Sequence, residues 1–237
     1  MSAPLLEARG LRRSWAGRRV VDGLDLSVHA GEVVGLLGPN GAGKTTTFQL
    51  LTGLLKPDAG DVRLRGVPLT GPLHARVRAG LGYLPQHATL FRGLTVRQHL
   101  FVPLEARGAP RAAAQGLLAD AGLSALADQP ATALSGGERR RLEIARCLAA
   151  DPRVLLLDEP FAGVDPVAVG GLVARFRALA AAGLGVLLTD HAVREALSAC
   201  DRVLLLVEGR LVFEGAPEDV AQDPRARERW LGASWSS

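Results

Sequence analysis

The chain has 237 residues, with 28 Lys or Arg against 24 Asp or Glu, so it is long enough for one substantial domain and carries a formal net charge of +4. Basic and acidic residues are mixed along the chain and aromatic residues are only 4%, which argues against direct nucleic-acid binding. The longest apolar stretch, around residues 178–188, falls short of the roughly 20 residues that cross a bilayer, so a membrane path would need another chain.

The chain begins with about 30 residues of short, alternating strands, which suit a small antiparallel sheet. Further along, short apolar runs predict buried strands at 33–37, 81–84, 154–157 and 184–189. Helices are expected at 45–51, across the Ala- and Leu-rich stretch 95–126, from 135 onward and at 167–181. Residues 203–207 and 211–214 flank Glu208-Gly209 and predict a hairpin. Apolar strands that alternate with helices indicate an α/β fold whose parallel sheet is covered on both faces.

A phosphate-binding loop follows the first buried strand. Residues 38–45 fit the pattern G-x-x-x-x-G-K-[ST], and the predicted ligands of ATP are Gly38, Pro39, Asn40, Gly41, Ala42, Gly43, Lys44, Thr45 and Thr46. Glycines let backbone N–H groups converge on phosphate oxygens, while Lys44 and the start of the next helix add positive charge. The Thr45 hydroxyl is expected to bind Mg²⁺. An ordinary glycine-rich turn is the alternative, but the strand before it and the helix after it favour a nucleotide site.

Two carboxylates end the apolar strand 154–157. Ligands bind at the carboxyl ends of strands in doubly wound sheets, so Asp158 is expected to bind Mg²⁺ and Glu159 to act as the general base of ATP hydrolysis. The alternative is a strand end that simply turns into solvent.

Between the loop and the acidic strand lies the segment Leu134-Ser135-Gly136-Gly137-Glu138. Ser135 and Glu138 have the spacing of a capping box, which predicts a helix start and, with the glycines, an anion site without a lysine. The three arginines that follow, residues 139–141, are expected mostly on a solvated face.

That segment resembles the signature motif of the ATP-binding-cassette (ABC) ATPases. The resemblance implies a single domain over 1–237, with a RecA-like core and antiparallel subdomain at about 1–86 and 150–237 and a helical subdomain at about 90–149. It also implies a homodimer, because Ser135, Gly136, Gly137 and Glu138 would cap ATP held by the second copy. By the same resemblance, Gln86 is expected to reach Mg²⁺ and the attacking water, and His191 to contact the γ-phosphate. Trp15 is expected to stack on the adenine, and Asp165 to belong to a loop at the dimer interface.

Longer stretches, such as 134–146, 158–166 and 183–197, resemble the ATPase subunit of the bacterial lipopolysaccharide export transporter. This implies a dimer beneath two integral-membrane permease subunits, at the cytoplasmic face of the inner membrane, with Phe91 and Arg92 as candidates for receiving the permease. The nearest alternative is the ATPase of a branched-chain amino acid importer. An ABC protein that acts on DNA or the ribosome, and a binding module without turnover, fit the sequence less well.

Overall fold

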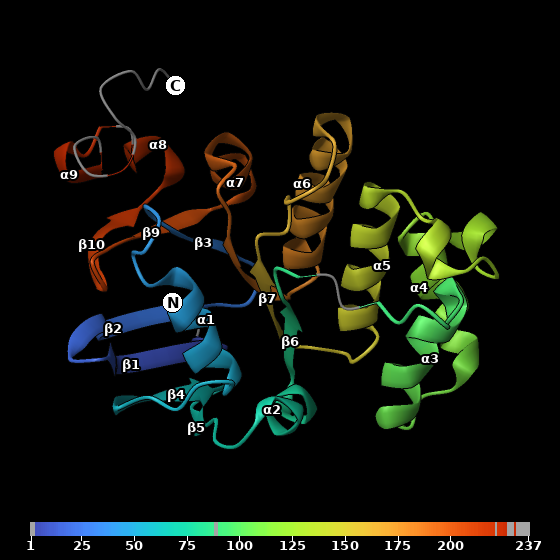
Figure 1. Ribbon diagram of the computed structural model, residues 1–237, viewed down its shortest axis with the longest axis horizontal. Coiled ribbons are helices and arrows are strands. Elements are labelled where there is room, and N and C mark those ends of the chain that lie inside the picture. The colour runs from blue at the N-terminus through green and yellow to red at the C-terminus, as the bar shows by residue number, and fades with distance from the viewer. Residues whose placement is uncertain (1–2, 88–89, 221, 227–229, 231–237) are drawn as a thin grey trace.

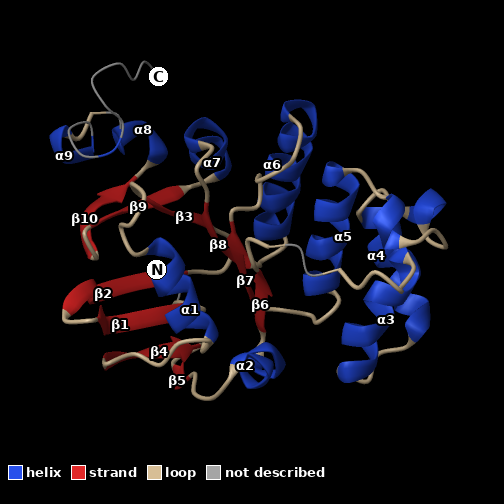
Figure 2. Ribbon diagram, in the orientation of Figure 1, coloured by secondary structure: helices blue, strands red, loops and turns tan. Residues whose placement is uncertain are grey.

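The structure is a computed structural model that describes residues 3–87, 90–220, 222–226 and 230. Its strands form a six-stranded, mostly parallel sheet and a four-stranded antiparallel sheet, and helices flank the larger one (Figures 1 and 2). The predicted α/β class, with a parallel core and a small antiparallel sheet, is therefore confirmed. None of the helices in these described ranges is long and apolar enough to span a membrane.

The larger sheet has the strand order β10-β9-β3-β8-β7-β6. Its strands are β3 (Val33–Leu37), β6 (Leu81–Leu84), β7 (Val154–Asp158), β8 (Gly185–Thr189), β9 (Arg202–Val207) and β10 (Arg210–Gly215). The strands from β9 to β6 run parallel, and β10 returns antiparallel to β9 as the predicted hairpin. The carboxyl ends of β3, β6, β7 and β8 therefore lie along one edge, where ligands bind in such sheets.

Each central strand is buried on both faces, which is why it is apolar throughout. In β7, Val154 and Leu156 pack toward α1 and the antiparallel sheet, whereas Leu155 and Leu157 pack toward α6 and α7. The helices that flank this sheet are α1 (Lys44–Thr52), α2 (Leu73–Ala79), α6 (Pro166–Ala181), α7 (Val193–Ala199), α8 (Pro217–Val220) and α9 (Pro224–Ala226).

The antiparallel sheet has the order β2-β1-β4-β5 and shares a core with α1. Its strands are β1 (Leu6–Trp15), β2 (Arg18–Val28), β4 (Ala59–Leu64) and β5 (Val67–Pro68). The turn between β1 and β2 brings the start of β2 to the beginning of α1: a Cβ on Gly43 would lie 2.4 Å from the carbonyl oxygen of Val20. This sheet therefore abuts the phosphate-binding loop.

A helical segment lies to the right of β6 in Figure 1. It comprises α3 (Val96–Ala106), α4 (Ala114–Asp120), α5 (Gly136–Leu148) and three short 3-10 turns at Arg111–Ala113, Ser124–Leu126 and Ala131–Ala133. These elements share an apolar cluster that includes Leu100, Leu118 and Leu142. A capping box begins α5 at Ser135, as its sequence predicts.

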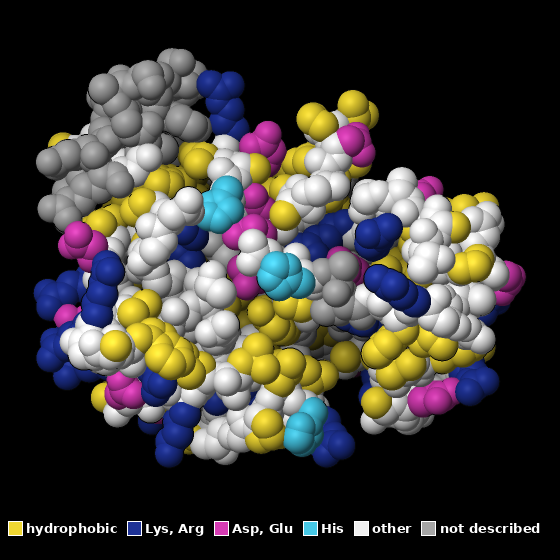
Figure 3. Space-filling model, viewed as in Figure 1, with side chains coloured by type: hydrophobic (Ala, Val, Ile, Leu, Met, Phe, Trp, Pro, Cys, Tyr) yellow, Lys and Arg dark blue, Asp and Glu magenta, His cyan; other side chains and the backbone are white. Residues whose placement is uncertain are grey.

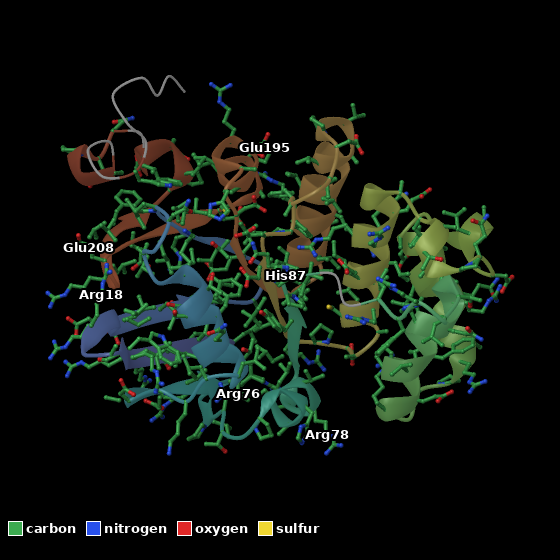
Figure 4. All side chains as sticks on the ribbon, in the orientation of Figure 1. Arg18, Arg76, Arg78, His87, Glu195 and Glu208 are labelled. Carbon is green, nitrogen blue, oxygen red and sulfur yellow. The ribbon has the colours of Figure 1, made fainter. Side chains whose placement is uncertain are left out.

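One buried arginine joins α2 to the end of the loop helix α1. Arg76 Nη1 donates to the carbonyl oxygens of Leu50 and Leu51, at 3.0 and 2.7 Å, and so adds a side-chain donor to the last turn of α1, where the Gly53 N–H also donates to Leu50. Figure 4 shows Arg76 directed toward α1, while Arg78 projects from the outer side of α2. Burial lowers the pKa of Arg76, but a guanidinium stays charged at neutral pH and favours the negative end of α1.

Candidate functional site

The phosphate-binding loop connects β3 to α1 in a conformation that two glycines permit. Gly38 has φ 147° and Gly43 has φ 106°, and a Cβ at either residue would collide with the backbone of a neighbouring strand. Gly41 and Asn40 are exposed at the outer bend, while Ala42 is buried beneath it. The loop thus turns its backbone outward at the start of α1, where N–H groups and the helix end favour an anion.

Lys44 lies within this loop and not in open solvent. Its ammonium donates to the carbonyl oxygens of Gly38 and Pro39, at 2.7 and 3.0 Å, and only 8% of the residue is exposed. Burial lowers the pKa of Lys44, and the carboxylates of Asp158 and Glu159 oppose that shift. Thr45 is exposed and Thr46 half-buried on the first turn of α1, directly after Lys44.

Asp158 ends β7 as a buried carboxylate, with 2% of the residue exposed. Among the described side chains its Oδ1 is one of a few buried polar atoms without a hydrogen-bond partner, and Thr189 Oγ1, on the paired residue of β8, is another. Burial, and then the adjacent charge of Glu159, raise the pKa of Asp158 to about 6, although Arg140, Tyr83 and Lys44 favour its ionised form.

Those unpartnered oxygens give a test of whether a cation fits here. Hard divalent cations such as Mg²⁺ take oxygen ligands and bind through one or two carboxylates together with substrate phosphates. The Asp158 carboxylate has a buried oxygen without a partner and acts on the nearby ammonium of Lys44, and such an oxygen suits this kind of ion. No group of three or more His, Cys, Asp or Glu suited to a metal occurs in the described part of the chain, so a bound cation would depend on phosphate oxygens.

Glu159 is held between two polar side chains that come from other strands. Gln86, just after β6, donates from Nε2 to Glu159 Oε2 at 2.7 Å, and His191 Nε2, just after β8, lies 2.8 Å from Glu159 Oε1. The backbone of Glu159 has φ 51°, an uncommon conformation for a residue with a side chain, and such strain clusters at functional sites. The three predicted catalytic residues therefore meet at one point.

Acidic and histidine side chains gather near the middle of the face shown in Figure 3. Asp190, directly before His191 in the chain, has a part in the site that sequence reasoning missed. Its Oδ2 accepts from the N–H of Phe161 and its Oδ1 from that of Ala192, both at 2.9 Å, so it joins the loop after β7 to the one that carries His191. Burial raises the pKa of Asp190. An acidic residue directly before His191 was the only sequence signal for this role.

The expectation that the three arginines after the signature segment lie mostly on a solvated face is wrong for Arg140. This residue is 5% exposed, and its guanidinium pairs with Glu143 at 2.9 Å. It also donates to the carbonyl oxygens of Asp158, Glu159 and Pro160, at distances of 3.2, 2.7 and 2.9 Å. The i, i+3 spacing of Arg140 and Glu143 was the signal that would have suggested a pair. Arg140 thus fixes the strained backbone that presents Glu159.

The signature segment forms a helix cap within its own chain. Ser135 Oγ donates to Glu138 Oε2 at 2.7 Å, and the Glu138 carboxylate also accepts from the Ser135 N–H at 2.9 Å. These bonds lower the pKa of Glu138. Next to the cap, a Cβ on Gly136 would lie 2.6 Å from the carbonyl oxygen of Gly163. The segment therefore packs against the loop 162–165, and Asp165 caps α6 through the N–H of Ala168.

The loop-bearing helix and the signature helix are separate in space. Figure 1 shows α1 and α5 on opposite sides of β6 in projection. A hollow of 700 Å³ beside the signature segment is lined by Ser135, Gly137, Glu138 and Asp165, together with residues of α4, α5 and α6, and by no residue of the phosphate-binding loop. The structure thus brings the phosphate loop, Asp158, Glu159 and His191 together, but places the signature residues elsewhere.

Trp15 ends β1 and is 49% exposed. The guanidinium of Arg13 lies over its ring, 4.6 Å from the centroid. Since the hairpin that carries Trp15 abuts the start of α1, the ring lies on the side of the molecule that holds the phosphate loop.

Phe91 lines a groove of 1420 Å³ between α2, β6 and the helical segment. Three of the exposed large apolar side chains, Leu54, Phe91 and Val102, all lie on this groove, and Figure 3 shows hydrophobic side chains on both sides of the hollow. Arg92 lines a smaller hollow that adjoins Phe91. Buried His99 accepts the Phe91 N–H at 2.8 Å and stacks on its ring, a contact that the sequence did not indicate.

Comparisons with known proteins agree over nearly the whole chain. The ABC transporter family profile matches residues 21–162. The lipopolysaccharide export system ATP-binding protein LptB of Escherichia coli K12 is 46% identical over 96% of this chain and 97% of its own length. An uncharacterised ABC transporter ATP-binding protein of Rhizobium meliloti is 48% identical over 98% of this chain and 87% of its own length. A solved ATP-binding cassette of an ABC transporter, in its ADP conformation, matches with a TM-score of 0.87 at 26% identity, over 98% of this chain and all of that one.

Proposed function

This chain belongs to the ABC transporter family as an ATP-hydrolysing subunit, and from that premise we propose that it powers lipopolysaccharide export. The observation that carries the cargo assignment is the 46% identity to LptB, which extends over 96% of this chain and 97% of that protein. An importer of branched-chain amino acids is the weaker alternative, because LptB, the relative whose name states a cargo, belongs to an export system.

In the proposed reaction, Lys44 and the N–H groups of residues 38–45 bind the phosphates of ATP. Glu159 accepts a proton from the attacking water while the water oxygen bonds to the γ-phosphorus. The bond between the γ-phosphorus and the bridging oxygen of the β-phosphate breaks, which leaves ADP and phosphate. The 2.7 and 2.8 Å contacts of Glu159 with Gln86 and His191 support these roles, since both neighbours are placed to orient the base. Asp158, Thr45 and Gln86 would hold Mg²⁺, which would supply charge neutralisation at the phosphates.

We further infer that the working unit is a homodimer with two composite sites. Ser135 and the following glycines begin α5 with an exposed cap, a geometry that binds anions, yet they line a hollow without any residue of their own phosphate loop. A second copy that approaches face to face would bring its bound γ-phosphate to this cap. Asp165, next to the same hollow, would lie at the interface.

The groove lined by Leu54, Phe91 and Val102 is the proposed contact for the membrane permeases. Its apolar floor is exposed on a single chain, and exposed apolar patches of this kind mark protein–protein contacts. Phe91 and Arg92 would receive the partner, with His99 fixing the position of Phe91. The protein would then lie at the cytoplasmic face of the inner membrane through its partners, two permease subunits.

Purification of the tagged chain from its native membranes, followed by identification of its partners, tests this function. Lipopolysaccharide export predicts two large permeases with periplasmic domains, and depletion of the chain should stop lipopolysaccharide from reaching the outer membrane. Two smaller permeases together with a soluble amino-acid receptor would contradict export and favour import.

A further inference from the structure

We propose that Arg13 positions the base of ATP: anchored by Asp58, it covers one face of the Trp15 ring and leaves the other face for adenine. This inference rests on the nucleotide site proposed above and extends it to two residues that lie outside the phosphate-loop, signature and strand-end motifs.

The contact between Arg13 and Trp15 has the geometry of a cation–π pair. The two residues are two positions apart on β1, so both side chains project from one face of the strand. The guanidinium carbon lies 4.6 Å from the ring centroid, well inside the range of about 6 Å for such contacts. Trp15 is nevertheless 49% exposed, so the ring keeps surface for a second partner.

The guanidinium is anchored by partners other than the ring. Arg13 Nη1 donates to Asp58 Oδ1 at 2.9 Å and to the carbonyl oxygen of Lys56 at 3.2 Å. Asp58 Oδ2 accepts the N–H of Ser14 at 2.7 Å, so one carboxylate fixes both the side chain and the strand that carries the tryptophan. Arg13 Nε is buried without a hydrogen-bond partner. The orientation of the guanidinium is therefore set by Asp58 and the ring, at the expense of one hydrogen bond.

The hairpin places this assembly beside the phosphate loop. Ser14 pairs with Arg19 in the β1–β2 register, and the next residue of β2, Val20, touches Gly43 at the start of α1. A ring held in one orientation next to the loop loses less side-chain freedom when a base stacks on it, which strengthens binding. A purine covers more of the ring than a pyrimidine, so a fixed ring also favours ATP over CTP.

Titration calorimetry of the full chain with ATP, CTP and inorganic tripolyphosphate tests this role. Arg13→Ala is expected to raise the Kd for ATP by about three- to tenfold and to reduce the preference for ATP over CTP. The Kd for tripolyphosphate, which has no base, should stay as in the wild type. Arg13→Lys, which keeps a cation over the ring, should recover part of the affinity. Asp58→Asn should shift ATP binding in the same direction as Arg13→Ala.

Arg9→Ala is the matched control. It makes the same change on the same strand, but Arg9 pairs with Glu7 on the surface. All three affinities should stay at their wild-type values.

Three results would overturn the inference. One is an Arg13→Ala variant that binds ATP as the wild type does, although Trp15→Ala binds it more weakly. Another is an equal loss of affinity for ATP and tripolyphosphate, which would indicate damage to the whole site. If Trp15→Ala itself binds ATP normally, the stacking role of Trp15 fails and the role of Arg13 fails with it, while tripolyphosphate binding separately tests the phosphate loop.

Discussion

The end of β7 and the start of α5 are both sites for anionic chemistry, yet they differ in how complete they are within one chain. At β7, Glu159 already contacts Gln86 and His191, and its charge acts on the nearby ammonium of Lys44. At α5, the Ser135 hydroxyl and N–H both donate to the Glu138 carboxylate of the same helix. Folding of one chain assembles the first site, whereas at the second site the Ser135 hydroxyl is bonded, among the described residues, only to Glu138 of its own helix.

This difference has a physical cause. Parallel strands align their carboxyl ends, so residues distant in sequence converge at one edge without any partner chain. A helix N-terminus, in contrast, must satisfy its own N–H groups, and a capping box does this locally. A bound γ-phosphate would replace Glu138 as the partner of Ser135, so we expect the signature segment to act only when a second chain supplies that phosphate.

The largest effect is expected from Glu159→Gln, at the assembled site. The amide keeps the shape but cannot accept the proton of the attacking water, so the rate of ATP hydrolysis should fall about 100- to 10,000-fold. ATP affinity should change little, because the amide retains one oxygen that accepts hydrogen bonds. Phosphate release in single-turnover experiments measures the rate, and hydrolysis within about threefold of the wild-type rate would refute the role of Glu159 as base.

Lys44→Ala probes the phosphate loop and should raise the Kd for ATP by about 100-fold, since a charge-assisted contact contributes about 2–3 kcal/mol. Equilibrium binding of a fluorescent ATP analogue measures the loss. Lys56 is the only other lysine of the chain and is exposed, so Lys56→Ala is the matched control and should bind as the wild type does. Tight binding by Lys44→Ala would contradict the assignment of the loop.

Arg140→Met tests the link between the two regions, because Arg140 stands on α5 and holds the backbone of Glu159. The change removes the buried ion pair with Glu143 and the three bonds to the backbone of residues 158–160, so the unfolding free energy should fall by about 3 kcal/mol and hydrolysis by about tenfold. Chemical denaturation and steady-state rates measure both. Arg139→Met, on the exposed side of α5, is the control and should change neither the unfolding free energy nor the rate of hydrolysis. An Arg140→Met variant as active and as stable as the wild type would contradict the proposed link.

Asp158→Asn should separate stability from function at the assembled site. The pKa of Asp158 is raised to about 6 from 3.8, so the folded state holds its proton more tightly, and stability is lost as pH rises from about 4 to about 6. At pH 8 the asparagine variant should therefore be more stable, by at most about 2–3 kcal/mol, while Mg²⁺-dependent hydrolysis is abolished.

Urea denaturation at pH 4 and pH 8 measures this effect, which should vanish at the lower pH. Asp128→Asn, at a side chain that is 82% exposed, is the control and should be neutral at both. An Asp158→Asn variant less stable than the wild type at pH 8 would show that the buried carboxylate is well compensated.

Much of the fold and of the assembled site was predictable because the signals are local. The apolar run of β7 ends directly in Asp158 and Glu159, the glycines of the phosphate loop precede Lys44, and the capping box marks Ser135 as a helix start. In these cases adjacent residues determine the conformation, and the topology of a parallel sheet then brings the strand ends together.

The contacts that could not be predicted join residues far apart in sequence. Arg140 appeared as one of three consecutive arginines, and although its spacing to Glu143 suggests a pair, nothing in the sequence indicates that it turns inward to the loop after β7. Likewise, His99 fixes Phe91 and Asp190 joins two loops through burial and backbone N–H groups, which the tertiary structure alone determines. Charged residues are exposed on average, so the sequence does not indicate which of them, such as Arg140 and Asp190, are buried with a partner.

The mass of the Glu159→Gln variant in ATP and Mg²⁺, measured by sedimentation velocity, tests the central claim that two chains complete each site. The account predicts a dimer with ATP and a monomer without it. It also predicts that adding Ser135→Arg, which obstructs the signature cap, keeps the protein monomeric while each chain still binds ATP. A monomer at saturating ATP, or a dimer that forms regardless of Ser135→Arg, would contradict it.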